Sequence, residues 1–222
     1  MGIVLKNNKL NIFLSSNIIN GIITNNNLLS LLDKKNISFI SKDYNFYTNS
    51  VLYEMNIYYK KDNFNNIINI LLKEFGLDNS FLEKKINDLS SGDKKILKYL
   101  LMLLDNKKIL VIDEPFLDLD YCHKKRIISI FKKIINHSNK TIIIISNNSD
   151  LIYSLCDKVL FINNYDTLYG DISLFHNKEI LDKYKVEEPL IVKFINYVKE
   201  KKVLINYSKD IRDLIKDVYK SV

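Results

Sequence analysis

The chain has 222 residues, a formal net charge of +7 and a hydrophobic fraction of 47%. This length corresponds to one or two domains, and the apolar fraction excludes a disordered chain. No apolar run reaches the roughly 18 residues that a membrane-spanning helix needs, so we expect no transmembrane segment. We interpret the two cysteines, Cys122 and Cys156, as free, buried thiols of a cytosolic protein rather than a disulfide.

The residue usage is strongly biased. The chain contains no Ala, Gln or Trp and only five Gly, whereas Asn, Ile and Lys are abundant, as AT-rich codon usage would produce. A net positive charge often indicates nucleic-acid binding. Here almost all of it is Lys interspersed with Asp and Glu, which favours an ordinary solvated surface, and we expect no nucleic-acid partner.

Short apolar, β-branched runs alternate with helical patterns along the chain. Predicted strands cover residues 18–23, 37–41, 109–112, 141–146 and 159–162. The last three runs have no polar alternation, as expected for parallel strands buried on both faces. Predicted helices cover residues 64–75, 79–86, 93–104, 121–135, 180–201 and 208–219, with Pro189 starting a new segment. This alternation predicts an α/β fold with a mostly parallel sheet.

Two adjacent carboxylates end one of these predicted strands. The run ILVI at residues 109–112 leads into Asp113, Glu114 and Pro115. Ligands bind at the carboxyl edge of parallel sheets, where Asp113 can hold Mg²⁺ through water and Glu114 can act as a general base on an attacking water. Strands often end in acids, so this pair alone is equally compatible with no catalytic role.

A second motif, LSSGD at residues 89–93, opens the predicted helix 93–104. Ser90 or Ser91 can cap that helix, whose free N–H groups and positive dipole end favour an anion such as phosphate. A plain helix cap is the alternative interpretation. The two motifs together, at this spacing, are far more specific than either one.

In combination these segments resemble the ATP-binding subunits of ABC transporters. LSSGD, with Ser90, Ser91, Gly92 and Asp93, resembles the LSGGQ signature, and ILVIDEP resembles Walker B. The LDLD segment that ends at Asp120 resembles the D-loop, and TIIIISNNSD at residues 141–150 resembles the switch strand. The resemblance implies a P-loop NTPase-like domain with a helical signature subdomain and a reduced antiparallel β-subdomain.

The C-terminal part resembles the extension of energy-coupling factor (ECF) ATPases, which energise bacterial uptake of vitamins and transition-metal ions. The resemblance lies in GDISLF at residues 170–175, EILDKYKVEEP at 179–189 and SKDIRDLIKDVY at 208–219. It implies a nucleotide-binding domain over residues 1–168, with a helical subdomain at about 58–90, and a helical extension over 169–222. The first forty residues match this family poorly.

The nucleotide-binding loop of this family is not matched. A P-loop, G-x-x-x-x-G-K-[ST], wraps phosphates with its glycine backbone and its lysine. No Gly-x-x-x-x-Gly occurs in the chain, and the corresponding turn reads Thr24-Asn25-Asn26-Asn27. We therefore expect ATP and Mg²⁺ as cofactors but only weak binding of ATP at the chain's own site.

Two further family positions also differ. The Q-loop glutamine has no counterpart, and Ser41 or Lys42 stands near its place. Asn147 replaces the switch histidine, so that position can donate or accept a hydrogen bond but carries no charge. Phe13 is the residue available for the adenine-stacking aromatic position. His123, His137 and His176 are interpreted as solvated surface residues.

In the family, two subunits pair head to tail, and the signature of one closes over the ATP held by the P-loop of the other. By this resemblance, residues 90–93 would complete a partner's site, while Glu114 would belong to the chain's own impaired site. The hypothesis is an ABC subunit of an ECF-type importer of a vitamin or metal ion at the cytoplasmic face of the cell membrane. It predicts two partners, a second ABC ATPase subunit and a transmembrane coupling component.

The alternative is a non-catalytic pseudo-ATPase that serves as a structural subunit of another complex. The aromatic residues between the Q-loop place and the next predicted helix lie where the family meets its transmembrane partner. An interface and core packing are equally compatible with this cluster, which comprises Tyr44, Phe46, Tyr47, Tyr53, Tyr58 and Tyr59.

Overall fold

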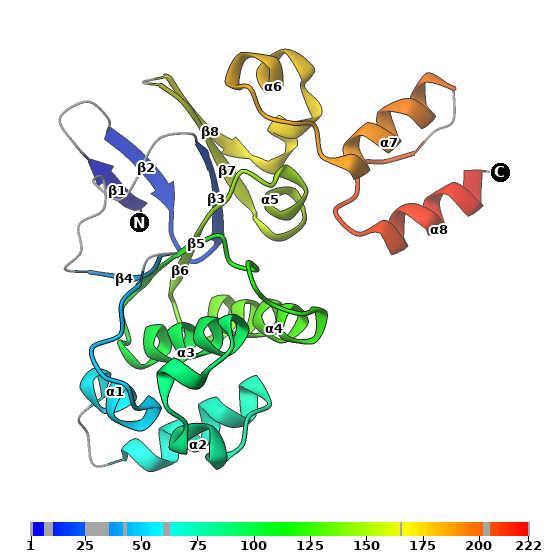
Figure 1. Ribbon diagram of the computed structural model, residues 1–222. Helices are drawn as coiled ribbons and strands as arrows, with labels where there is room; N and C mark the ends of the chain where they lie inside the picture. The colour runs from blue at the N-terminus through cyan, green and yellow to red at the C-terminus, as the bar shows by residue number, and fades with distance from the viewer. Residues whose placement is uncertain are drawn as a thin grey trace. The chain divides into compact units, whose positions relative to one another are not determined.

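The computed structural model describes residues 2–6, 11–24, 36–41, 44–59, 63–164, 166–201 and 205–221. The chain divides into two compact units. The terminal unit contains Met1–Leu32 and Ile143–Val222, and the middle unit contains Asp33–Ile142. Figure 1 labels the elements of both units, which alternate strands and helices as the α/β pattern predicts.

The strands of the terminal unit form two kinds of pairing. β1 (Gly2–Lys6) and β2 (Asn11–Ser15) form a two-stranded antiparallel sheet. β3 (Ile19–Thr24) is parallel to β7 (Lys158–Asn163), which is antiparallel to β8 (Asp166–Asp171). β3 is buried along its whole length, with Ile19, Ile22 and Ile23 in the core and the polar side chains of Asn20 and Thr24 buried as well.

Glycine is needed on β3 where a helix packs closely against it. A Cβ atom at Gly21 would lie 2.5 Å from Cγ2 of Ile152. Ile152 is a fully buried residue of α5 (Ser149–Leu155). The remaining helical segments of this unit follow β8 in the chain: the 3₁₀ helix η4 (Ile172–His176), α6 (Lys178–Tyr184), α7 (Leu190–Glu200) and α8 (Ile211–Ser221). The predicted segment 180–201 is thus two helices, because Lys185 adopts a left-handed conformation and Pro189 precedes the second helix.

An aromatic stack joins the C-terminal helices to the rest of the terminal unit. The ring of Tyr207 stacks on His176 with centroids 3.6 Å apart, and the Lys199 Nζ lies 3.5 Å from the Tyr207 centroid. The His176 Nε2 is hydrogen-bonded to the Tyr153 hydroxyl at 2.9 Å. The interpretation of His176 as a solvated surface residue is therefore wrong, because its ring is a packing partner.

The environment of His176 makes the stability of this unit depend on pH. Burial, with a smaller contribution from the Lys199 charge, lowers the pKa of His176 below its ordinary value of 6.5. His176 therefore binds a proton more readily in the unfolded chain than in the folded one. Its contribution to the free energy of unfolding is fully present above pH 6.5 and is lost as the pH falls through the folded pKa.

We expect the free energy of unfolding to decrease as the pH falls below 6.5, and we expect His176→Phe to remove part of this decrease. Urea unfolding at a series of pH values measures it. His137→Phe is the control, since His137 is exposed at the end of a helix. Equal pH slopes for wild type and His176→Phe would contradict the expectation.

In the middle unit, β4 (Ile37–Ile40) is parallel to β5 (Ile109–Asp113) in the register that places Ile37 beside Ile109. β6 (Thr141–Ile145) begins in this unit, where the Thr141 N–H donates to the Lys108 carbonyl at 2.9 Å. The predicted strands 109–112 and 141–146 are confirmed to within one residue. The mostly parallel arrangement predicted from continuous apolar runs is also confirmed.

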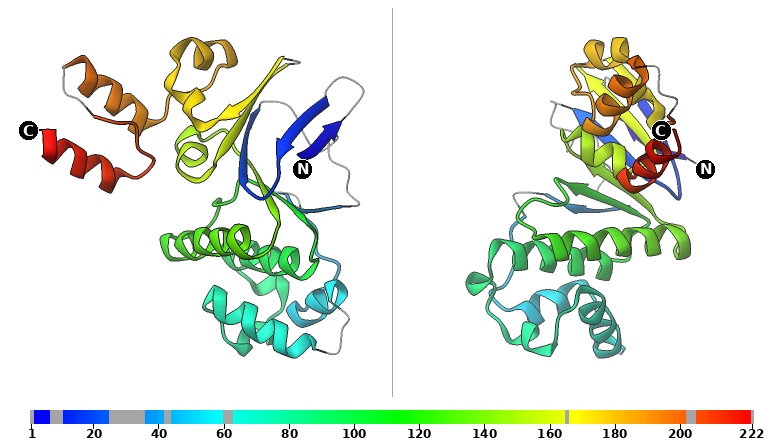
Figure 2. Two further views of the ribbon diagram at one scale, coloured as in Figure 1. Left: turned by 180° about the vertical axis from the view of Figure 1, so that it is seen from behind. Right: turned by 90° about the vertical axis from the view of Figure 1, so that its right-hand side faces the viewer.

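The helices of the middle unit pack together (Figure 2). They are α1 (Val51–Tyr58), α2 (Phe64–Phe75), the 3₁₀ helices η2 (Asn79–Glu83) and η3 (Ile86–Asp88), α3 (Ser91–Leu104) and α4 (Tyr121–His137). The predicted helix 79–86 is wrong. Lys84 and Lys85 are extended there, since Lys85 forms a β-bridge with Ser50 and the Lys84 carbonyl accepts from the Val51 N–H.

Aromatic rings from three helices fill the centre of these packed helices. Phe75 of α2 stacks on Tyr99 of α3 at 6.4 Å, and Tyr99 contacts Phe131 of α4 at 6.0 Å. α2 ends at Gly76 (φ 70), and Arg126 of α4 donates to the Phe75 carbonyl at 2.7 Å. The three helices are therefore held by ring contacts and by a charged cap on the end of α2.

The two cysteines have different environments. Cys156 is fully buried and burial raises its pKa, whereas Cys122 is exposed on α4. The interpretation of both as buried thiols is therefore wrong for Cys122. Neither forms a disulfide, since both are free. None of the described helices combines the length and the hydropathy that crossing a bilayer requires.

Asparagine takes over a backbone role that glycine usually has. Left-handed φ values are found at Asn17, Asn106, Asn139 and Asn164. Asn tolerates this region better than most residues because its short amide can bond to nearby backbone. The bias toward Asn is therefore used structurally at turns.

Candidate functional site

The signature segment forms a capped helix start. The Ser90 Oγ accepts from the Asp93 N–H at 3.0 Å, so Ser90 is the cap and Ser91 is the first residue of α3. Ser90 and Ser91 are exposed. The free N–H groups of this first turn and the positive end of the α3 dipole favour an anion such as a phosphate. The helix cap expected from the sequence is therefore present, and phosphate binding by this turn stays a prediction.

Gly92 lies against the segment that follows Walker B. A Cβ atom at Gly92 would lie only 2.9 Å from the main-chain carbonyl oxygen of Asp118. Asp118 itself has a left-handed φ of 65°. Glycine is therefore required at this position by a close approach to backbone, which has little freedom to move aside.

The two predicted catalytic carboxylates follow β5 as expected. Asp113 is its last residue, Glu114 has a left-handed φ of 47°, and both are partly exposed. The turn is anchored from α3, where the hydroxyl of the buried Tyr99 donates to the Pro115 carbonyl at 2.7 Å. A non-glycine residue at such a φ costs free energy and is often found at functional sites.

Lys95 is a residue that the sequence interpretation missed. Its Nζ donates to the carbonyl oxygens of Glu114 at 2.8 Å and Asp113 at 3.2 Å, and the residue is 5% exposed. The pKa of Lys95 is lowered to about 8, mainly by burial and in smaller part by the charge of Lys98. The carboxylates of Asp113, Asp118 and Glu114 act in the opposite direction and raise it. The sequence held no signal that could have found it, because Lys94 and Lys98 lie on the same helix.

Lys98, one turn further along α3, contacts the Q-loop place. Its Nζ donates to the Ser41 carbonyl at 3.2 Å and lies 5.7 Å from the centroid of the Tyr44 ring. Ser41 directly follows β4, and Lys42, the other candidate for that place, lies outside the described residues. The signature helix therefore contacts the ends of two neighbouring strands.

Asp120, the predicted D-loop aspartate, caps α4. Its Oδ1 accepts from the His123 N–H at 2.8 Å, and its Oδ2 is bonded to the His123 Nδ1 at 2.8 Å. Hydrogen bonds from the His123 backbone and side chain lower the pKa of Asp120. The carboxylate is therefore ionised and engaged in the cap, although it remains exposed to solvent.

The switch position belongs to the terminal unit. The Asn147 Oδ1 accepts from the Thr24 N–H at 3.3 Å, so its amide contacts the end of β3. Asn148 caps α5 by accepting from the Leu151 N–H at 2.9 Å. Phe13 is 62% exposed. The predicted P-loop counterparts Asn25, Asn26 and Asn27 lie outside the described residues.

The candidate residues are thus divided between the units. Ser90, Gly92, Asp113 and Glu114 belong to the middle unit, and Asn147 belongs to the terminal unit. No three His, Cys, Asp or Glu side chains gather as a metal cage in the part of the chain that is described. A partly exposed Asp113 suits Mg²⁺, which keeps several waters and takes one or two carboxylates together with nucleotide phosphates.

Known protein structures show the same fold. The chain superimposes on cbiO1 from Clostridium perfringens, part of the ABC transporter complex cbiONQ, with a TM-score of 0.60 and 19% identity over 84% of this chain and 90% of that one. It matches the ATP-binding cassette MJ0796, a dimer bound to ADP and Pi, with a TM-score of 0.58 and 15% identity over 77% and 96% of the two chains. The fold is that of an ABC ATPase domain.

Comparison of the sequence with curated proteins finds relatives among the ATP-binding subunits of ECF transporters. The chain is 28% identical over 153 residues to the energy-coupling factor transporter ATP-binding protein EcfA3 of Oenococcus oeni, covering 68% of this chain and 53% of that protein. It is 28% identical over 133 residues to EcfA2 of Staphylococcus epidermidis, covering 59% and 46%. Its homologues are thus ECF transporter ATP-binding subunits and other ABC ATPases, as the signature and Walker B resemblance predicted.

The chain spans about half the length of the curated relatives it matches. No family model matches it.

We expect Gly92→Ala to destabilise the protein by about 1–3 kcal/mol, because the added Cβ overpacks against the Asp118 carbonyl. This cost outweighs the gain of up to about 1 kcal/mol in helix propensity. Urea unfolding of the variant measures it, with Ser91→Ala at the exposed neighbouring position as the control. A Gly92→Ala protein as stable as wild type would contradict the close approach.

Proposed function

We propose that this chain is an ATP-binding-cassette subunit of an ECF-type membrane importer of a micronutrient. In this proposal its own ATP site is impaired, and its signature completes the site of a partner. One contrast supports it above all: the signature helix start is fully formed around Ser90 and Gly92, while the P-loop place contains no lysine.

The signature is the part of the chain suited to nucleotide. ATP would supply the phosphoanhydride bond whose hydrolysis drives transport, and the first turn of α3 would hold its terminal phosphate through main-chain N–H groups. Ser90 keeps this turn in place by its cap, and Gly92 leaves the backbone uncovered on the side of Asp118. These residues bind and orient; the P-loop that carries the phosphates comes from the partner.

The chain's own site has lost charged contacts. One charged hydrogen bond contributes about 1.5–3 kcal/mol, so the loss of the lysine and of the glycine backbone together should weaken ATP binding by several orders of magnitude. Asn147 carries no charge, and its amide oxygen is bonded to the Thr24 N–H. Asp113 and Glu114 would hold hydrated Mg²⁺ and orient water, but without a firmly bound nucleotide we propose that they contribute little.

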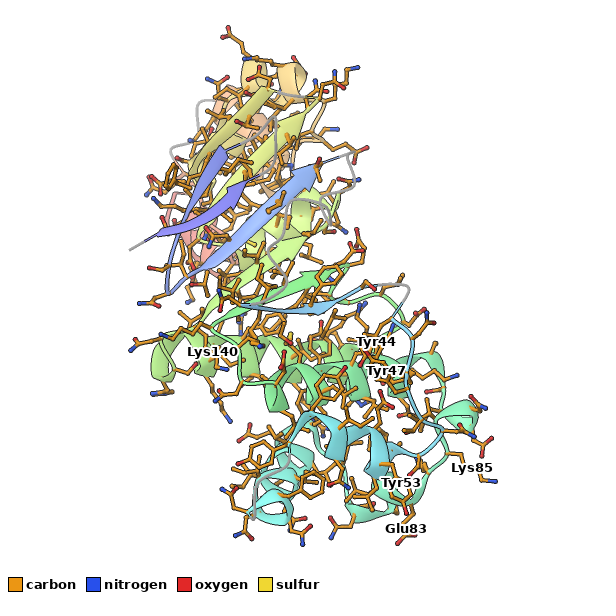
Figure 3. The ribbon with its side chains drawn as sticks, turned by 90° about the vertical axis from the view of Figure 1, so that its left-hand side faces the viewer. Tyr44, Tyr47, Tyr53, Glu83, Lys85 and Lys140 are labelled. Carbon is orange, nitrogen blue, oxygen red and sulfur yellow. The ribbon has the colours of Figure 1, made fainter. Side chains whose placement is uncertain are left out.

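A surface around α1 suits the transmembrane coupling component. Tyr47 and Tyr53 are 76% and 68% exposed (Figure 3), with Leu52 and Ile57 exposed on the same helix. The loop that carries Tyr47 is held by a hydrogen bond to α1, because the carboxylate of the fully buried Glu54 accepts from the Tyr47 N–H at 3.0 Å. Exposed, pre-ordered aromatic side chains are typical of interfaces. Docking there would place the chain at the cytoplasmic face of a membrane.

We expect the isolated chain not to hydrolyse ATP. In the assembled pair, Gly92→Asp should abolish the partner's ATPase, because it places a side chain and a negative charge at the phosphate-binding turn. Glu114→Gln should change the rate by less than about twofold. Steady-state ATPase assays of the purified chain and of the pair measure both effects.

A purified chain with turnover that Glu114→Gln removes would contradict this assignment. A pair that is sensitive to Glu114→Gln and insensitive to Gly92→Asp would contradict it as well. If no ABC partner exists and the chain is inactive alone, the structural pseudo-ATPase is the remaining interpretation.

We expect Tyr53→Glu to reduce recovery of the membrane component at least tenfold, because it places a charge in an aromatic contact. Tagged chain is pulled down from gently solubilised native membranes and analysed by mass spectrometry. Ile70→Glu is the matched control, since Ile70 is 60% exposed on α2. Recovery of a polytopic membrane protein by Tyr53→Glu at wild-type levels would contradict the proposed surface.

A further inference from the structure

Three successive turns of the signature helix contact the main chain of the segment that follows β5. Gly92 approaches the Asp118 carbonyl, and Lys95 donates to the carbonyls of Asp113 and Glu114. One turn later the Tyr99 hydroxyl donates to the Pro115 carbonyl at 2.7 Å. All of these contacts are to backbone carbonyl oxygens, so α3 contacts the main chain at residues 113–115 and 118.

Lys95 is the charged member of this set, and its position is unusual. Lysine is rarely buried without a partner, because removing the ammonium from water is costly. Its neighbours Ile96, Leu97 and Tyr99 are buried as well, so an apolar residue would suit the packing at position 95. The compensation comes from the two carbonyl oxygens and from the nearby carboxylates of Walker B.

The carbonyls that Lys95 binds lie where β5 ends and the chain turns. β5 ends at Asp113, and Glu114 turns the chain through a left-handed φ of 47°. Within this turn the Leu117 N–H donates to the Glu114 carbonyl at 3.3 Å. The Lys95 ammonium adds two hydrogen bonds from α3, one to each of the Asp113 and Glu114 carbonyls.

We propose that Lys95 is a positioning residue that fastens the turn at residues 113–114 to the signature helix. The signature and the D-loop are thereby presented to a partner as one rigid piece. Lys98 has a separate role on the same helix, since it bonds to Ser41 at the end of β4. The attachment of residues 113–114 to α3 is inferred from these contacts alone. Its effect on ATP hydrolysis at a partner's site rests on the proposed function.

Hydrogen exchange on the purified full-length chain tests the fastening. In Lys95→Met we expect amide exchange in peptides covering residues 113–120 to rise about tenfold, because charged hydrogen bonds to that backbone are lost. In Lys98→Met we expect the rise in residues 36–41 and not in 113–120. Lys132→Met is the matched control, since Lys132 is exposed on α4 of the same unit.

Unchanged exchange at residues 113–120 in Lys95→Met would overturn the proposal. An equal rise over all peptides, including those of α7 and β8, would also overturn it, because it would make Lys95 a residue of general stability. If Lys95→Met and Lys98→Met raised exchange in the same peptides, the two lysines would not have separate roles. Lys95→Arg, which keeps several donors, should restore part of the protection.

The assembled pair tests the consequence for catalysis. There Lys95→Met should lower kcat of the partner's site at least tenfold with little change in the KM for ATP, and Lys95→Arg should recover part of the rate. A normal kcat despite faster exchange would overturn the positioning role. If no pair can be assembled, the proposed function fails, and the exchange experiment still decides the fastening.

Discussion

The main chain that follows β5 is held against one helix at several points, and the candidate site of the middle unit depends on these contacts. α3 supplies an ammonium from Lys95 and a phenol from Tyr99 to the backbone after β5. The same helix begins with the capped signature turn, so the geometry of residues 90–93 is tied to that of residues 113–118. The contacts between α3 and the segment after β5 therefore connect the packing of this helix with the geometry of the candidate site.

The two sets of candidate residues differ in what surrounds them. Around α3, polar groups are matched by caps and by charged donors, as shown by Ser90, Lys95 and Asp120. At the end of β3, the switch position holds a neutral amide bonded to the Thr24 N–H. The two sets therefore differ in charge: charged side chains take part around the start of α3, and a neutral amide stands at the end of β3.

Much of the fold could be predicted from the sequence because its signals are strong and local. Continuous apolar runs located β5 and β6, and the apolar spacing of α4 set its start at Tyr121. The helix predicted over 79–86 failed because a tertiary β-bridge to Lys85 overrides local propensity. His176 was misplaced because Tyr207, 31 residues further along the chain, covers its ring, and Cys122 was misplaced because it lies on an exposed part of the first turn of α4.

The positions of some candidate residues could be predicted, whereas their roles stay predictions. The fixed spacing of the motifs placed Ser90 and Gly92 at a helix start, and Asp113 and Glu114 at a strand end. The contacts of Lys95 and Lys98 with strand ends could not be found, since a single sequence shows a lysine-rich helix and not which lysines turn inward. Only the tertiary structure distinguishes Lys95, at 5% exposed, from Lys94 and Lys98, which are partly exposed on the same helix.

The left-handed asparagines have a practical consequence for protein engineering. An L-residue in this conformation costs free energy that glycine does not pay, and the residues concerned lie at turns of the chain. Glycine at Asn106 or Asn139 would relieve that local strain, although it would also raise the entropy of the unfolded chain. Asn106 and Asn139 are therefore two positions at which these opposing effects on stability can be compared without any change in the core.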